Sequence, residues 1–224
     1  MVYQIIQSKN KYRIFIETLI LTLLILIIGI SLGFYIEYSR AKTVIDDYKN
    51  FEIDALDLKL QNYYYQIMDS ADCKIAIEEN LKFADRIYDT GLKIEKYEEA
   101  NELTEDILLE KKKYVLLKTE LWLNSVLLKK KCNNPFHTIV YFYSKDKDIP
   151  KEAEQTAISN ILKELKEEKG NEIILLPIAG DLGLPAIEMQ MRIYNITYLP
   201  STLIDEKIII ESFYTSDKIL TYLK

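Results

Sequence analysis

The 224-residue sequence predicts an α plus α/β chain, in which an N-terminal transmembrane helix and a long α-helical hairpin stalk precede one small α/β domain. Three observations support this fold class. An apolar run near the N-terminus carries no charge. All five prolines lie at Pro135 or beyond, and Gly91 is the one glycine in residues 37–134, which favours long helices. The segments after residue 132 follow the order βαβ and then αββα, which is typical of a three-layer domain.

The first element is predicted to be a transmembrane helix over residues 14–36, after a short tail at 1–13. Residues 18–36 carry no charge, and as a helix they span about 28 Å, close to the roughly 30 Å of a bilayer's hydrocarbon core. The run ends in Gly33-Phe34-Tyr35 and lacks the small residues of a cleavage site, so we expect a retained anchor and not a cleaved signal peptide. A tight group of positive residues precedes the run. The tail is therefore expected in the cytoplasm and the body outside the cell membrane.

The second region, residues 37–132, is predicted to be helical. Its apolar residues recur at steps of three and four. They indicate a first helix from Ala41 to about Asp69, a second from Cys73 to Ala100 and a third from Thr104 to Lys131. Gly91 lies on the apolar stripe of the second helix, where it either ends the helix or allows a close contact.

The third helix of this region carries an apolar repeat of about 3.5 residues, which is typical of a two-helix coiled-coil seam. The members of the repeat are Ile107, Tyr114, Leu117, Leu121, Ser125 and Leu128. The seam predicts packing against another helix. It also makes the stalk a candidate surface for a homo-oligomer.

The two cysteines are placed almost symmetrically about the break near Glu102. Cys73 lies 29 residues before it and Cys132 lies 30 residues after it. If the chain reverses there, two helices of about 44 Å bring both cysteines to the same end of the hairpin. We therefore predict a disulfide, which an external compartment would permit, and the alternative is a pair of unlinked buried thiols.

The third region, residues 133–224, alternates between strand and helix patterns. Strands are indicated by β-branched and aromatic runs, and helices by apolar residues at steps of three and four. The predicted elements are a strand at 137–143, a helix at 150–168, a strand at 172–178, a short helix at 185–194, a strand ending at Ile204, a tight turn at 205–207, a strand ending at Ser212, and a helix capped by Thr215 or Ser216 and ending near Leu223.

This order of elements, with Tyr198-Leu199-Pro200-Ser201 following a short helix, resembles the thioredoxin fold family. The resemblance covers 92 of the 224 residues. It implies that Pro200 is a cis-proline and that Leu199 offers its backbone to an extended peptide. A protein or peptide partner is therefore expected at this loop.

The redox motif of that family, two cysteines separated by two residues, is missing. It should follow the first strand, where this sequence reads Asp148-Ile149-Pro150-Lys151. Neither Asp148 nor Lys151 can form a disulfide, so the resemblance implies the fold without the thiol chemistry. We predict no catalytic residue, cofactor or metal site. One histidine and two cysteines make a poor zinc site, and His137 is interpreted as a strand-edge residue.

The net charge of −6, with acids and bases interspersed, argues against nucleic acid as a partner. The expected function is that of a membrane-anchored, extracytoplasmic thioredoxin-like protein, redox-inactive, that binds protein or peptide partners. Two alternatives stay open. One is a membrane-bound thiol-disulfide oxidoreductase that uses Cys73 and Cys132, and the other is a structural tether that oligomerises.

Overall fold

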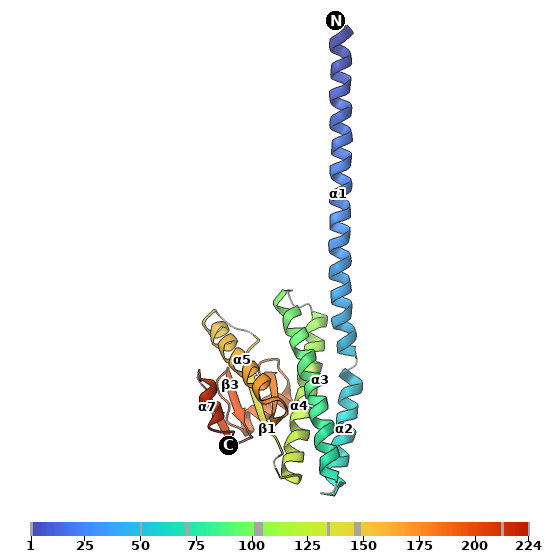
Figure 1. Cartoon of the computed structure of the whole chain (residues 1–224). Coiled ribbons are helices and arrows are strands. Elements are labelled where there is room, and N and C mark those ends of the chain that lie inside the picture. Colours follow the sequence, from blue (N-terminus) through green and yellow to red (C-terminus); the bar gives the residue numbers. More distant parts are fainter. Residues whose placement is uncertain are drawn as a thin grey trace. The chain divides into compact units, whose positions relative to one another are not determined.

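The structure, a computed structural model, describes residues 2–49, 51–69, 72–100, 105–133, 135–145, 149–211 and 213–223. Within these residues the protein is mostly helical and contains one mixed four-stranded sheet (Figure 1). The chain forms two compact units, residues 1–46 and 47–224.

The first unit consists of helix α1 (Val2–Lys49) up to Asp46, and the last three residues of that helix belong to the second unit. Its segment Tyr12–Ile36 is long and apolar enough to cross a membrane, and every side chain in that segment is exposed. This confirms an apolar helix of membrane-spanning length at the predicted position. The prediction that a new helix begins at Ala41 is wrong. No proline or glycine follows the apolar segment before Lys49, so nothing ends the helix there.

Three further helices follow, namely α2 (Phe51–Ile67), α3 (Cys73–Ala100) and α4 (Glu105–Lys131). The bounds of α3 agree with the prediction, whereas the predicted turn at 101–104 lies outside the described residues. Both α2 and α3 pack against α4 (Figure 1).

Buried polar side chains fix the heights of these helices relative to one another. The side-chain amide of Asn62 on α2 donates to the side-chain oxygen of Asn124 on α4, and the Asn124 amide donates to the carbonyl of Leu58 over 2.9 Å. Asn80 on α3 donates to Ser125 Oγ of α4 over 3.0 Å. Asn62 and Asn80 therefore lie at the same level on two sides of α4, because their partners are sequence neighbours.

The predicted disulfide between Cys73 and Cys132 is present. It joins the first residue of α3 to the residue that follows α4, and the two Cα atoms are 5.7 Å apart, within the usual range. The symmetric spacing of the cysteines therefore predicted the pair correctly, because α3 and α4 run antiparallel as a hairpin.

The sheet contains β1 (His137–Tyr143), β2 (Ile173–Ala179), β3 (Ser201–Ile204) and β4 (Ile208–Ile210) in the order β2-β1-β3-β4. The β1–β2 pair is parallel and the other two pairs are antiparallel. Helix α5 (Ile149–Lys169) and the short 3₁₀ helix η2 (Gly170–Glu172) connect β1 to β2. Helix α6 (Pro185–Ile193) precedes β3, and α7 (Ser216–Leu220) follows β4.

Two elements near the C-terminus are shorter than predicted. Strand β4 ends at Ile210, and Ser212 lies outside the described residues. Helix α7 ends at Leu220, and Thr215 occupies its N-cap position without a side-chain capping hydrogen bond. The pattern of apolar residues predicted both elements correctly. It did not predict where they end, because their ends depend on contacts with the rest of the sheet.

Helices cover both faces of the sheet. Ile139 and Tyr141 of β1 lie in an apolar cluster with Ile158 of α5 and Ile219 of α7. On the opposite face, the ring of Phe142 meets the ring of Trp122 on α4 edge to face, with centroids 6.0 Å apart. The alternation along β1 therefore places α5 and α7 on one side and α4 on the other.

The helices before the sheet do not form a free-standing stalk. Residues 47–224 are one compact unit, and the packing of α4 on the sheet crosses the predicted boundary at 132/133. From Tyr114 to Leu128 the members of the predicted α4 seam are buried, but Trp122 and Val115 outside that seam are buried as well. Helix α4 is buried on several sides because it contacts α2, α3 and the sheet at once.

Gly91 allows a close contact between α3 and α4. A Cβ atom at this position would lie 2.5 Å from the hydroxyl oxygen of Tyr114. That hydroxyl is buried and donates a hydrogen bond to the carbonyl of Ile87. Of the two interpretations of Gly91, close packing is confirmed, since α3 continues through it to Ala100.

We expect Gly91→Ala to lower the free energy of unfolding by up to about 2 kcal/mol. The added methyl displaces a buried hydroxyl from its hydrogen bond, at a cost of roughly 1–3 kcal/mol, and this exceeds the gain of about 1 kcal/mol in helix propensity. Urea unfolding of the full-length protein in detergent measures the change. In a Tyr114→Phe background the same substitution should be neutral or stabilising, and an equal loss in both backgrounds would contradict the explanation.

Candidate functional site

The candidate site lies at the carboxyl end of β1, where three loops meet. Gln155 of α5 is buried and forms two hydrogen bonds with the backbone of Ser144, at 2.6 and 3.1 Å. Asp181, in the loop after β2, accepts hydrogen bonds from the hydroxyl of Ser144 and from the backbone N–H of Lys145. Tyr198, in the loop before β3, donates to Glu154 of α5 over 3.0 Å. These contacts fix the loops after β1, after β2 and before β3 against one another.

The loop before β3 passes directly over Gly180. A Cβ atom on Gly180 would lie 3.0 Å from Leu199 Cδ1 and 3.0 Å from Met191 Sδ, both closer than ordinary contacts. The backbone N–H of Gly180 donates to the carbonyl of Tyr143 over 2.9 Å. The absence of a side chain at Gly180 therefore lets the Leu199 side chain pack close to the end of β1.

The peptide bond between Leu199 and Pro200 is cis, as the sequence resemblance implied. Pro200 is buried and Leu199 is half-buried. In the part of the chain that the structure describes, neither the N–H nor the C=O of Leu199 has a hydrogen-bond partner. Tyr198 beside it is 41% exposed. The polar backbone groups of Leu199 therefore lie next to an exposed aromatic side chain.

Residues 148–151, which the sequence resemblance aligns with a redox motif, follow β1 at the same end of the sheet. Asp148 lies outside the described residues. Ile149 and Pro150 are the first two residues of α5, and Ile149 is 84% exposed. Proline suits this position because the first turn of a helix leaves its N–H groups without partners. An exposed isoleucine thus lies at the start of α5, between the two positions, Asp148 and Lys151, that the resemblance aligned with thiols.

A cleft of about 460 Å³ adjoins this segment. Helices α3 and α4 form one of its walls, and α5 with the sheet forms the other. Tyr114 and Tyr143 line the cleft together with Lys118, whose ammonium lies 4.5 Å from the centroid of the Tyr114 ring. The cleft reaches Ser144, so a chain bound at the site could place side chains in it. Sequence analysis missed this cleft because it forms between segments that are distant in the sequence.

The disulfide lies far from the site. Cys132 is five residues before the start of β1, whereas Ser201, next to Pro200, pairs with Phe142 near the end of β1. The seven residues of β1 separate the two ends by about 20 Å. The disulfide therefore cannot act on a peptide that is bound at Leu199.

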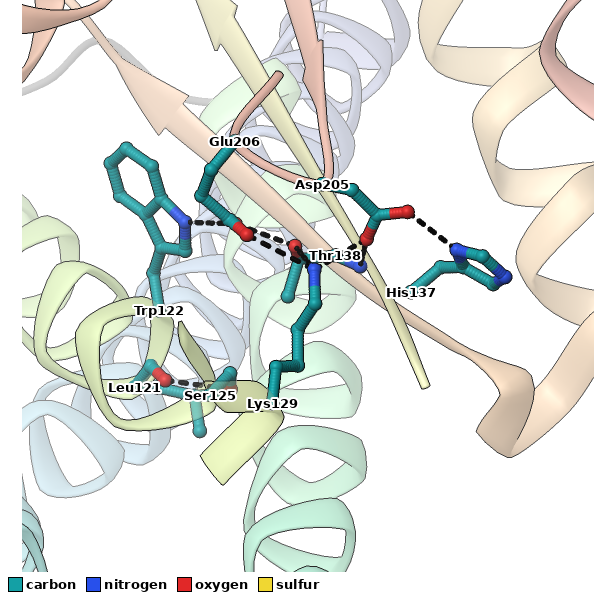
Figure 2. Close-up of polar contacts among 8 residues, drawn as sticks. All are labelled: Leu121, Trp122, Ser125, Lys129, His137, Thr138, Asp205 and Glu206. Atoms are coloured by element: carbon teal, nitrogen blue, oxygen red, sulfur yellow. Dashed lines mark hydrogen bonds and ion pairs between the residues drawn. The ribbon is translucent and has the colours of Figure 1, made fainter. Parts of the chain in front are cut away.

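A second polar cluster occupies the opposite end of the sheet, where α4 meets the β3–β4 turn (Figure 2). Lys129 of α4 has a side chain that is only 7% exposed, and its ammonium donates to Thr138 Oγ1 over 2.9 Å. It also forms ion pairs with the carboxylates of Asp205 and Glu206. Trp122 donates to Glu206 over 2.9 Å. The cluster satisfies each buried charge, which makes it a structural clamp between α4 and the hairpin.

Asp205 is the most heavily bonded carboxylate of this cluster. It accepts hydrogen bonds from Lys129 and from the backbone N–H of Thr138, and it contacts Nδ1 of His137 over 2.6 Å. Burial by itself raises the pKa of Asp205, but the bonds from Lys129, His137 and Thr138 outweigh it and hold the pKa below its ordinary value of 3.8. His137, predicted as a strand-edge residue, lies at the start of β1 and orients this carboxylate.

The turn that carries these acids adopts an unusual backbone conformation. Asp205 and Glu206 both have positive φ angles, 48° and 58°, which usually favour glycine or asparagine. The contacts of both side chains with Lys129 hold the turn in this conformation. Sequence analysis placed the turn correctly but missed the cluster. The one local signal was an Asp-Glu pair at positions where a two-residue turn normally has glycine.

Comparisons of the chain with protein-family models, with curated proteins and with solved structures found no match. Its function is therefore argued from the geometry of this site.

Proposed function

We propose that this chain is a membrane-anchored, redox-inactive thioredoxin-like protein that binds an extended segment of a partner protein at Leu199. The observation that carries the proposal is the backbone of Leu199, which is held beside the end of β1 and has no hydrogen-bond partner among the described residues. An extended peptide can pair with such a backbone edge as an added strand, while neighbouring pockets select its side chains. Tyr198, Ile149 and the adjoining cleft would supply that selection.

The thioredoxin-like assignment covers residues 133–224. It is supported by the sheet order β2-β1-β3-β4 with a single parallel pair, by the α5 crossover between β1 and β2, and by the position of Pro200 directly before β3. Strand β3 then runs antiparallel to β1, so Leu199 lies level with the end of that strand.

The anchor and its orientation rest on two separate features. Tyr12–Ile36 has the length and composition of a membrane span, and positive residues precede it in the sequence. Disulfides persist in oxidising compartments, so the Cys73–Cys132 bond supports a body outside the cytoplasm. The redox state of these two cysteines, in protein isolated with its thiols blocked, tests the compartment.

We place thiol-disulfide exchange second to binding. An oxidoreductase needs its reactive sulfur beside the bound substrate, and the disulfide lies at the other end of β1. Insulin reduction by the full-length protein separates the two functions. Turnover that disappears in Cys132→Ala would favour the enzyme over the binding protein.

The binding test uses decapeptides selected from a random library on the full-length protein in detergent. We expect N-methylation of one central backbone amide to weaken binding at least tenfold, because it removes the donor that pairs with the Leu199 carbonyl. Tyr198→Ala should weaken binding by a similar factor. Tyr222→Ala is the matched control, since Tyr222 is also exposed but lies beyond α7.

Two outcomes would contradict the proposal. In one, no N-methylated peptide loses affinity, so that backbone pairing makes no contribution. In the other, Tyr198→Ala and Tyr222→Ala change the affinity equally, so that the peptides bind elsewhere on the protein.

A further inference from the structure

Helix α2 is apolar on two opposite sides, and only one of them is covered. Leu58 and Tyr65 are buried against the rest of the unit, at 0% and 3% exposure. At 100° per residue, the opposite side of the helix carries a second apolar set, between 49% and 80% exposed. We call this set the α2 stripe, and its members are Ile53, Leu56, Leu60, Tyr63, Tyr64 and Ile67.

The α2 stripe has the spacing of a coiled-coil seam. Ile53, Leu60 and Ile67 are seven residues apart, and Leu56 and Tyr63 lie between them at alternating steps of three and four. Ile53 and Ile67 at the first heptad position and Leu56 at the fourth match the pattern that favours two parallel strands, whereas Leu60 at a first position and Tyr63 at a fourth depart from it. The seam predicted on α4 is a different one, and its members from Tyr114 to Leu128 are buried within the chain.

We infer that the α2 stripe is the interface through which two copies of this chain associate side by side, as a parallel helix pair. Leu60 of one copy then packs against Leu60 of the other. In the same way, Ile53 of one copy packs against Ile53 of the other, and Ile67 against Ile67.

The area of the stripe is of the order that a dimer needs. Its six side chains are half to four-fifths exposed and present several hundred Å² of apolar surface, against about 800 Å² that each partner contributes to an interface of standard size. Helix α4, which packs against α2, also exposes leucines at intervals of seven, namely Leu109, Leu116 and Leu123. Exposed apolar surface of this extent is typical of an interaction site.

The parallel arrangement rests on the anchoring proposed above. In each copy α2 begins at Phe51, only 15 residues after the apolar segment ends at Ile36. A parallel pair therefore brings the two N-terminal ends of α2 together, and with them the two anchors, which must enter the same membrane. Confinement to a membrane raises the effective concentration of the partner, which compensates for a seam of only about two heptads.

The charges of α2 disfavour a lipid surface as the occupant of the stripe. The helix contains Glu52, Asp54 and Asp57 but only one basic residue, Lys59. Helices that lie on membranes carry lysine and arginine on the polar face, because lipid headgroups are often anionic. A second copy requires no basic residues, because Glu52 already pairs with Lys113 of its own chain over 2.9 Å.

Cysteine cross-linking of the full-length protein in phosphatidylcholine vesicles tests the dimer. Under mild oxidation we expect Leu60→Cys to give a covalent dimer in at least tenfold higher yield than Lys82→Cys. Lys82 of α3 is the matched control, because its side chain is also exposed. Asn62 and Asn80 lie at the same level. Leu60 is two residues before Asn62 and Lys82 is two residues after Asn80, so the two substituted positions have the same height on antiparallel helices. Equal yields at the two positions would overturn the inference.

A second variant separates association from folding and from anchoring. Leu60→Glu should lower the dimer fraction at least tenfold without changing the melting temperature, since Leu60 is 60% exposed. Vesicle flotation reports the anchor independently of the dimer. A photoreactive residue at position 60 that cross-links to lipid and not to protein would also overturn the inference.

Discussion

Lys129→Met is expected to lower the free energy of unfolding by about 3–5 kcal/mol, and the melting temperature by about 10 °C. The substitution keeps most of the side-chain volume and removes the ammonium. The carboxylates of Asp205 and Glu206, with side chains 20% and 14% exposed, then face each other without a cation. Thermal unfolding of the full-length protein in detergent, followed by circular dichroism, measures the change.

Lys130→Met provides the matched control. Lys130 is the next residue of α4 and is exposed, so the same change there should cost less than about 0.5 kcal/mol. If the two variants had equal melting temperatures, the buried cluster would make no net contribution. A rescue by Asp205→Asn in the Lys129→Met background would show that the unpaired carboxylate is the cause.

The same cluster predicts a dependence of stability on pH. The folded pKa of Asp205 lies below its ordinary value of 3.8, so its contribution is fully present above that value. The contribution is lost as the pH falls through the folded pKa. The difference in stability between the wild type and Asp205→Asn should therefore be constant near neutral pH and shrink as the pH falls below about 4.

Cys73→Ser is expected to lower the free energy of unfolding by about 2–4 kcal/mol, since the bond closes a loop between residues 59 positions apart. It constrains the unfolded chain and clamps the base of the α3–α4 hairpin next to β1. Cys132→Ser should have the same effect, and the double variant should be no worse than either single one. Chemical unfolding of the three variants and the wild type measures these differences.

Reductant provides the control for the disulfide. It should lower the stability of the wild type to that of Cys73→Ser and leave both single variants unchanged. Losses that add in the double variant would mean that each thiol acts through its own packing. Two free thiols in protein isolated without reductant would remove both the bond and its support for an oxidising compartment.

Local patterns in the sequence determined the order of the elements and the position of the apolar helix. The apolar residues of α3 recur at steps of three and four, and β1 is a run of β-branched and aromatic residues. Both are properties of single segments, so no tertiary information is needed to identify them. Even the Cys73–Cys132 pair followed from counting along two helices, because a helical hairpin converts sequence distance directly into height. The cis peptide bond before Pro200 was implied by the family resemblance, which the order of elements around it carries.

The tertiary structure decided which surfaces those elements use. Helix α4 has apolar residues around much of its circumference, so its sequence could not show that the sheet covers one side. Lys129, Thr138 and Asp205 come from three segments whose neighbours are ordinary, and only the fold brings the charges together. In α2, Leu58 and Leu60 are equally apolar, two residues apart on opposite sides of the helix. Periodicity marks both sides alike, and only the packing of α2 on α4 shows which one is left exposed.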